Sequence, residues 1–166
     1  MPISDYLKYL RQYVGHELLL VPSVTAILYD DVGRILLVKH TDAHQWVAPG
    51  GSIEPNERPA DAVVREMWEE TRLLVQPVRI LGVFGGPEFL VKYKNDDQVT
   101  YIMTVFECHL LEGKAQADGV ETLEVGFFSH DDVAKLNLPM WARIVLPEMF
   151  RNQPNAQFQA SMWRPT

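Results

Sequence analysis

The segment REMWEETR (65–72) constrains the fold more than any other stretch, because its acidic and apolar residues separate when it is read as a helix. At about 100° per residue, Glu66, Glu69 and Glu70 gather within about 100° of arc. Apolar neighbours gather on the opposite side and predict which side meets a core. This apolar face comprises Ala60, Val63, Val64, Met67, Thr71 and Leu74.

This clustering of carboxylates is unfavourable in an isolated helix. Like charges three and four residues apart repel, and the C-terminal end of a helix disfavours anions. An acidic helix most often presents a solvated face. Here the apolar face keeps the three carboxylates from spreading apart. The helix is also preceded by Pro-Gly-Gly (49–51), whose glycines allow close backbone approach. A locally unfavourable pattern without evident compensation indicates function.

Binding of a hard cation is the chemistry that fits such a cluster. Mg²⁺ and Mn²⁺ prefer oxygen ligands, usually one or two carboxylates together with waters and substrate phosphates. A bound cation would turn the repulsion into shared coordination. A further carboxylate nearby could deprotonate an attacking water.

The longer segment GSIEPNERPADAVVREMWEETRL (51–73) resembles the box of the Nudix hydrolases. That pattern is Gly, five residues, Glu, seven residues, Arg-Glu, an apolar residue, any residue, Glu-Glu, any residue, Gly and an apolar residue. The family's late Gly is Arg72 here, and a non-Gly residue in a left-handed conformation costs about 1–2 kcal/mol. The matching positions are Gly51, Glu57, Arg65, Glu66, Met67, Glu69, Glu70 and Leu73.

The resemblance implies hydrolysis of a nucleoside diphosphate linked to another moiety, by attack of water on phosphorus with Mg²⁺ or Mn²⁺. Carried over by position, Glu66, Glu69 and Glu70 are expected to be metal ligands, together with the backbone carbonyl of Gly50. Glu57 and Arg65 are expected to form the pair that steadies the loop against the helix, with catalytic contributions from both and a secondary role in metal binding for Glu57.

The resemblance leaves the general base open. It is either a box glutamate, Glu69 or Glu66, or an acid on a later loop. The segment DGVETLE (118–124) offers Glu121 and Glu124 for the second alternative. A solvated turn is an equally good interpretation of those two residues.

The substrate is less constrained than the family. Pro87 lies fourteen residues after Leu73, which resembles the ADP-ribose branch, although a plain turn proline is an alternative. Trp46 and Phe84 are candidates for contact with the substrate. ADP-ribose or a sugar nucleotide is slightly preferred. The alternatives are a nucleoside triphosphate pyrophosphohydrolase and a non-catalytic module that senses a nucleotide. Phe89, Tyr93 and Tyr101 are further aromatics that could stack on a base, although packing is the better interpretation of each of these five aromatics taken alone.

Strand-like segments mixed with few helix-like ones predict an α/β sandwich around a mixed β-sheet and not a βαβ array. The resemblance makes this a Nudix-type α/β/α sandwich, here with an extra N-terminal helix. A single domain is expected over 1–150, with the helix at about 4–15 and a loosely held tail at 151–166. The apolar face of that helix allows a homodimer. Two strands, 23–30 and 35–40, are expected to form a hairpin. Further strands are predicted at 78–84, 89–93, 100–111 and 125–129, and helices at 131–136 and 139–150.

The formal net charge of −7 argues against a nucleic-acid polymer or a membrane surface as partner, because such binding depends on Lys and Arg. A small nucleotide substrate remains compatible. The chain shows no signal-peptide pattern and no long apolar run, so a soluble cytoplasmic protein is expected. Cys108 reads as a small buried hydrophobe. His40 and His44 flank a turn without partner cysteines and are expected to be surface or satisfied histidines rather than a zinc site.

Overall fold

The computed structural model describes residues 4–151 and 153–165, and their strands form two sheets. The elements are α1 (Asp5–Val14), β1 (Leu19–Leu28), β2 (Ile35–His40), β3 (Trp46–Val47), β4 (Gly50–Ser52), α2 (Pro59–Thr71), β5 (Leu73–Phe84), η1 (Pro87–Phe89), β6 (Leu90–Lys92), β7 (Gln98–Gly113), β8 (Thr122–Phe128), α3 (His130–Val133), α4 (Met140–Met149) and β9 (Gln157–Phe158). In the larger sheet the order is β4-β1-β7-β5-β9, and β6 pairs with the first three residues of β7. In the smaller sheet the order is β3-β2-β8.

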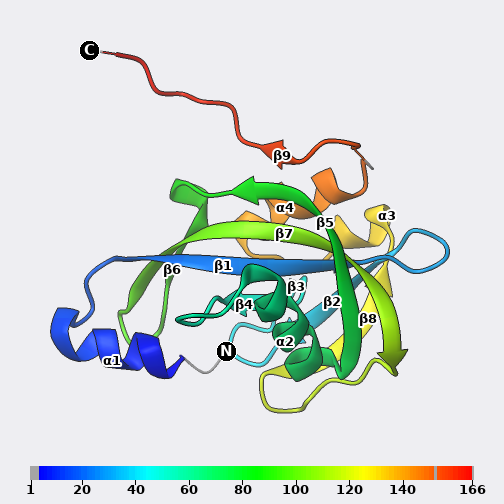
Figure 1. The fold of residues 1–166 in the computed structure, drawn as a ribbon, viewed down its shortest axis with the longest axis horizontal. Helices are drawn as coiled ribbons and strands as arrows, with labels where there is room; N and C mark the ends of the chain where they lie inside the picture. Colours follow the sequence, from blue (N-terminus) through cyan, green and yellow to red (C-terminus); the bar gives the residue numbers. More distant parts are fainter. Residues whose placement is uncertain (1–3, 152, 166) are drawn as a thin grey trace.

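The larger sheet is mixed, as predicted. β1 runs parallel to β7 from the Leu19–Val99 pair to the Leu28–Cys108 pair, whereas β5 runs antiparallel to β7. A parallel pair needs a long crossover connection, and everything from β2 to β6 lies between β1 and β7 in the chain. Figure 1 shows these long strands crossing the molecule, with α2 in front of them and α4 behind.

Strands β1 and β2 are buried on both faces, and their side chains show which helix covers each face. Along β1, Ile27 belongs to the core cluster with α4, whereas Ala26 and Leu28 belong to the cluster with α2. β2 behaves in the same way, because Leu37 packs toward α4 and Leu36 toward α2. Alternate side chains of a strand point to opposite faces, so the strands are sandwiched between helices. The predicted α/β/α sandwich is therefore confirmed.

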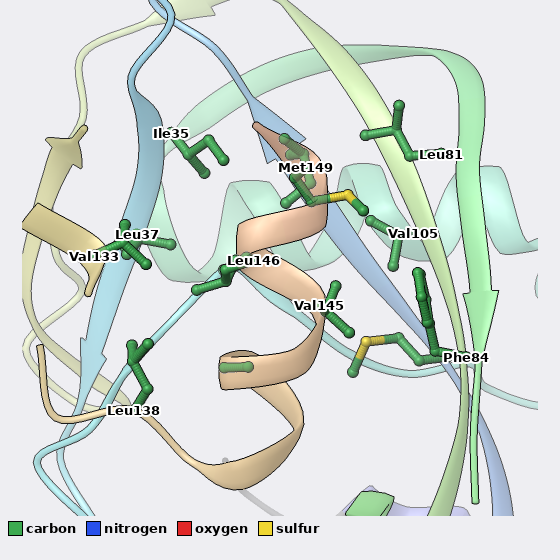
Figure 2. Close-up of a cluster of buried hydrophobic side chains, with 14 of the residues drawn as sticks. Ile35, Leu37, Leu81, Phe84, Val105, Val133, Leu138, Val145, Leu146 and Met149 are labelled. Atoms are coloured by element: carbon green, nitrogen blue, oxygen red, sulfur yellow. The ribbon is translucent and has the colours of Figure 1, made fainter. Parts of the chain in front are cut away.

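The core on the α4 side is apolar throughout. Figure 2 shows Val145, Leu146 and Met149 of α4 pointing between the two sheets, toward Leu37 and Val105. These residues repeat at the spacing of one helix face, and each is almost fully buried. This packing fixes the back of the sheet and leaves its α2 side to position the acidic residues.

The predicted hairpin of 23–30 and 35–40 is wrong. β1 and β2 belong to different sheets and share only the isolated bridge between Tyr29 and Ile35. The Asp30 carboxylate accepts hydrogen bonds from the backbone N–H groups of Val32 and Arg34, at 3.1 Å and 2.8 Å. This local turn passes the chain from one sheet to the other, a rearrangement that strand propensity does not encode.

The N-terminal helix α1 packs on its own domain. Ser4 caps it by accepting from the Leu7 N–H at 3.1 Å, and Leu7 is buried against Val21 and Val99. Other large apolar residues of the helix are exposed, among them Tyr9 and the still more exposed Tyr13. Association of two chains through this helix stays a prediction. Figure 1 places α1 at one end of the strands, near β6.

Part of the C-terminal segment is tied to the sheet. Gln157 and Phe158 form β9, which pairs in parallel with β5 at Gly82 and Val83. The described residues after β9 extend away from the body of the molecule (Figure 1), and Trp163 is exposed.

Cys108 is buried, and burial raises the pKa of its thiol to about 12. The thiol therefore packs as a small hydrophobe, as predicted. Within 4–151 and 153–165, no helix has both the length and the apolar character needed to cross a membrane.

Arg72, the departure from the box pattern, adopts the conformation for which glycine is suited. Its φ is 60° and its ψ is 23°, and its N–H closes α2 by donating to the Trp68 carbonyl at 3.0 Å. We expect Arg72→Gly to raise the free energy of unfolding by about 0.5–1 kcal/mol, because relief of strain exceeds the entropy that glycine adds to the unfolded chain. Urea unfolding measures this difference.

Arg72→Ala is the matched control, since it removes the exposed side chain and keeps the strained backbone. It should leave stability within about 0.5 kcal/mol of the wild type, as exposed substitutions generally do. Equal stabilisation by Ala and Gly would show that the side chain, and not the left-handed backbone, sets the stability here.

Candidate functional site

The acidic helix is not a solvated face. The apolar residues Val63 and Met67 are fully buried, and Glu66 and Glu70 are buried as well, with relative exposures of 5% and 1%. The side chain of Glu69 is 53% exposed. Two of the three glutamates thus lie in the interior, where an ionised carboxylate needs a compensating charge.

Arg65 is the centre of the hydrogen-bond network on this face. Its Nε and Nη2 donate to the two Glu57 oxygens at 2.8 Å and 3.0 Å, a bidentate pair. Its Nη1 donates to Glu66 Oε1 at 2.7 Å and to Glu69 Oε2 at 3.2 Å. Nη2 also donates to the Ser52 carbonyl at 3.0 Å. One guanidinium therefore binds three carboxylates and ties the loop after β4 to α2. It also holds the pKa of Glu57 below its usual range.

Gly50 and Gly51, which precede the helix, have no room for a side chain. A Cβ on Gly51 would lie 2.3 Å from Glu66 Oε1, and a Cβ on Gly50 would lie 2.2 Å from the Val24 carbonyl oxygen. The Gly50 N–H donates to Glu70 Oε2 at 3.3 Å. The predicted close backbone approach is thus an approach to β1 on one side and to the glutamates of α2 on the other.

The charge of this cluster is only partly compensated. Burial raises the pKa of Glu66 to about 7, with a further upward contribution from Glu70 and opposition from the Arg65 guanidinium. Glu70 Oε1 is buried and has no hydrogen-bond partner among the described residues. A buried oxygen without a partner, beside other carboxylates, is a donor set that suits a hard divalent cation.

The carboxylate oxygens do not converge on a common point. Among residues 4–151 and 153–165, no three acidic, histidine or cysteine side chains lie together in metal-binding geometry. The hydrogen bonds from Arg65 to Glu66 and Glu69 explain this, because they direct those two carboxylates toward the guanidinium. The carboxylate side chains and the Glu70 oxygen without a hydrogen bond suit a cation. Binding of a cation would turn Glu66 and Glu69 away from the Arg65 guanidinium that they now contact.

The two loop acids have different positions. Glu121 lines the same cleft as Glu66 and Glu69, and burial raises its pKa, with a smaller contribution from Glu70. Glu124 instead forms an exposed ion pair with Lys39 at 2.7 Å and does not line this cleft. The structure therefore brings Glu121, and not Glu124, to the acidic cluster.

Two adjoining cavities open beside the cluster. One, of about 290 Å³, lies between α1 and the acidic face of α2. The other, of about 490 Å³, has a more apolar lining on the far side of Gly50 and Gly51. Tyr93 and Tyr101 line both cavities, and their hydroxyl groups are hydrogen-bonded at 2.7 Å. Residues lining the first include Lys8, Arg11, Glu54 and Asp97, and those lining the second include His40, Val47, Met103 and Trp141.

The three residues expected to contact the substrate lie elsewhere. Trp46 packs edge-on against Phe128 with ring centroids 4.6 Å apart, and Phe84 is part of the core beneath α4. Pro87 is exposed at the start of η1. None of the three lines either cavity. Strand aromatics face a core or a ligand according to register, which the sequence alone does not resolve.

Some cavity residues carry no signal in the sequence. Trp141 lies on a helix whose other face is core, and Lys8 lies on the N-terminal helix, so no local motif marks either. His40 was expected at the surface or satisfied, but its side chain is 18% exposed and its Nε2 lacks a hydrogen-bond partner in the described part of the chain. Its place at the end of a strand, directly before the turn, is the one available signal.

The fold and the acidic cluster together define the class of protein. The sequence profile of the NUDIX domain matches residues 19–149. Because this match covers most of the chain, the protein belongs to the NUDIX family and is a Nudix hydrolase. The predicted family is confirmed. Helix α1 precedes the matched residues.

Individual relatives differ in the substrate that they are named for. A protein of Bacillus subtilis strain 168, provisionally described as an 8-oxo-dGTP diphosphatase, is 34% identical over 58% of each chain. The chain therefore spans less than two thirds of the length of that relative. The crystal structure of a UDP-X diphosphatase is similar with a TM-score of 0.68 at 25% identity, covering 95% of this chain and 75% of that one.

A third relative carries another substrate name. The crystal structure of an ADP-ribose pyrophosphatase from Streptococcus suis has a TM-score of 0.63 at 26% identity, covering 83% of this chain and 96% of that one. These likenesses agree on the hydrolase family and disagree on the substrate.

The raised pKa of Glu66 predicts the pH dependence of stability without metal. The usual value is 4.5 and the folded value is about 7. Between these pH values the folded protein holds a proton that the unfolded chain has released, so the free energy of unfolding falls as the pH rises. The loss between pH 5 and pH 8 should be on the order of 3 kcal/mol. Urea unfolding in EDTA at several pH values measures it.

Glu66→Gln is the control for this measurement, because its amide does not titrate. Its stability should change less over the same interval, with a residual slope from Glu121, whose pKa is also raised. The carboxylates with lowered pKa, such as Glu57 and Asp118, contribute only at lower pH. Parallel curves for wild type and variant would contradict the assigned protonation of Glu66.

Proposed function

We propose that this protein is a metal-dependent pyrophosphohydrolase that cleaves a nucleoside diphosphate linked to another moiety. The observation that carries the proposal is the burial of Glu66 and Glu70 beside a cleft, with one Glu70 oxygen lacking a hydrogen-bond partner among the described residues. Burial of two neighbouring carboxylates is costly unless a cation compensates them. Arg65 compensates Glu66 by a direct hydrogen bond, whereas within the described residues no arginine or lysine is hydrogen-bonded to Glu70, whose charge is left for a cation to compensate.

The proposed ligands of Mg²⁺ or Mn²⁺ are Glu66, Glu69, Glu70 and the carbonyl of Gly50. A bound cation would neutralise charge on the substrate pyrophosphate and lower the pKa of a coordinated water. Glu57 and Arg65 would hold the loop and the helix in register through their bidentate pair. If cation binding turns Glu66 or Glu69 away from Arg65, the Arg65 N–H groups would become available to donate to a substrate phosphate oxygen, for which a guanidinium is well suited.

The proposed reaction is attack of water on one phosphorus of the pyrophosphate. A new P–O bond forms to the water oxygen, and the bond from that phosphorus to the bridging oxygen breaks. The products are two phosphomonoesters, or inorganic pyrophosphate and a monophosphate when the substrate is a triphosphate. Glu69 and Glu121 line the cleft, so either carboxylate is placed to accept the proton from water. Glu66 lines the same cleft and is the third candidate.

ADP-ribose or a sugar nucleotide is the proposed substrate class. The cluster lies between two cavities, so a pyrophosphate at the carboxylates would extend one substituent into each. The larger cavity has the apolar lining that suits a base or a sugar face, including Trp141 and Met103. Likeness to the ADP-ribose pyrophosphatase of Streptococcus suis and to the UDP-X diphosphatase supports this class. Likeness to the Bacillus subtilis relative supports nucleoside triphosphates as the second candidate.

Hydrolysis of a substrate panel tests the proposal. The purified chain with Mg²⁺ is given ADP-ribose, sugar nucleotides, dinucleoside polyphosphates and nucleoside triphosphates, and products are separated chromatographically. We expect release of AMP from ADP-ribose, and a loss of kcat/KM of about 100-fold or more in Glu70→Gln, because a ligand is removed from the cation that would stabilise the transition-state charge. Glu69→Gln, on the exposed edge of the cluster, repeats the test with less risk to folding.

Glu112→Gln is the matched control, since Glu112 is an exposed glutamate on β7 that lines neither cavity. Its activity should equal that of the wild type. Cleavage of triphosphates alone would support the proposed hydrolase activity, but nucleoside triphosphates would replace ADP-ribose and sugar nucleotides as the substrate class. Binding of nucleotides without turnover of any would favour a sensing module and overturn the proposal.

A further inference from the structure

His40 occupies an irregular position at the end of β2. The pairing of β2 with β8 shifts register between Lys39 and His40, so that His40 lies opposite Thr122. Such irregularities re-aim side chains. The His40 N–H donates to the Gln45 carbonyl at 3.0 Å, which fixes the backbone at this point. The side chain is largely buried, on the border of the larger cavity.

The imidazole is directed at the most deeply buried glutamate of the cluster. His40 Nε2 lies 3.5 Å from Glu70 Oε1, and within the described residues each atom is buried without another hydrogen-bond partner. Buried polar groups are nearly always hydrogen-bonded. A shift of about 0.7 Å would bring the pair to charge-assisted hydrogen-bond distance, about 2.8 Å.

The rest of Glu70 is held by other groups. Its Oε2 accepts the Gly50 N–H at 3.3 Å, and its backbone carbonyl accepts from the Thr122 hydroxyl at 3.1 Å. Thr122 and His40 are cross-strand partners, so one pair of residues reaches both the backbone and the side chain of Glu70. In the part of the chain that the structure describes, Oε1 is the Glu70 oxygen without a donor, and it faces His40.

We infer that His40 is a positioning residue for Glu70. A proton on Nε2 would be donated to Oε1 and fix the rotation of the carboxylate, so that its remaining lone pairs face the cation that the proposed function requires. Ligating carboxylates are commonly held by such outer partners, whose loss weakens metal binding about 10- to 100-fold. The inference rests on the proposed function and adds to it a residue outside the box.

Binding of Mn²⁺ alone tests this inference without turnover. Free Mn²⁺ is measured by electron paramagnetic resonance during titration of the full chain. We expect His40→Ala to raise the dissociation constant at least about tenfold. In His40→Gln the amide nitrogen can occupy nearly the position of Nε2, so its constant should return to within about threefold of the wild-type value. His44→Gln is the matched control, because His44 is exposed four residues further along.

The outcomes separate the inference from the proposed function. If the wild type binds Mn²⁺ and His40→Ala has the same dissociation constant, the inference is overturned and the proposed function still stands. Equal weakening in His40→Ala and His40→Gln would show that hydrogen-bond donation is not what matters, and would also overturn it. Absence of Mn²⁺ binding by the wild type would overturn both. Circular dichroism of each variant verifies that the compared chains are folded.

Discussion

The hydrogen bonds of Arg65 are the interaction on which the candidate site depends. A single guanidinium donates to Glu57, Glu66, Glu69 and the Ser52 carbonyl, and so joins the loop after β4 to the acidic face of α2. Each of these bonds is charge-assisted or directed at a backbone acceptor, and their common donor is rigid and planar. Replacing it by a lysine would lose the bidentate contact to Glu57, even though the charge would remain.

The sandwich architecture explains why such compensation is needed. Because α2 packs its apolar face on β1 and β5, the residues on its flanks are carried into the interior. Glu66 is thereby placed against Gly51, and Glu70 against Gly50. A fold that buried these carboxylates for stability alone would be unfavourable, since buried ionised groups cost more than well-packed apolar ones. The arrangement is understandable when a cation is part of the functional state.

Much of this could be predicted from the sequence, for identifiable reasons. The periodicity around Met67 set the buried face of α2, and the box spacing placed Arg72 at a left-handed residue after the helix. Local patterns could not reveal long-range pairing. The crossover from β1 to β2 depends on which sheet each strand joins, and β9 is only two residues long. Phe84 and Tyr101 illustrate the same limit, because only the tertiary structure separates a core aromatic from one in a cavity.

His40 shows how a residue can be misread when its partner is distant in sequence. It lies thirty positions before Glu70, in a segment whose composition indicates an ordinary strand end. The register shift opposite Thr122 directs its ring at the buried carboxylate. The carboxylates and their neighbours thus form a connected set, contributed by β2, β4, α2 and the loop before β8.

A crystal structure with Mn²⁺, using anomalous scattering to locate the ion, tests the central claim most directly. We predict an anomalous peak bounded by the three α2 glutamates and the Gly50 carbonyl, with the Arg65 side chain moved off at least one of the carboxylates that it now contacts. Mn²⁺ bound elsewhere, with the Arg65 hydrogen bonds unchanged, would contradict that claim.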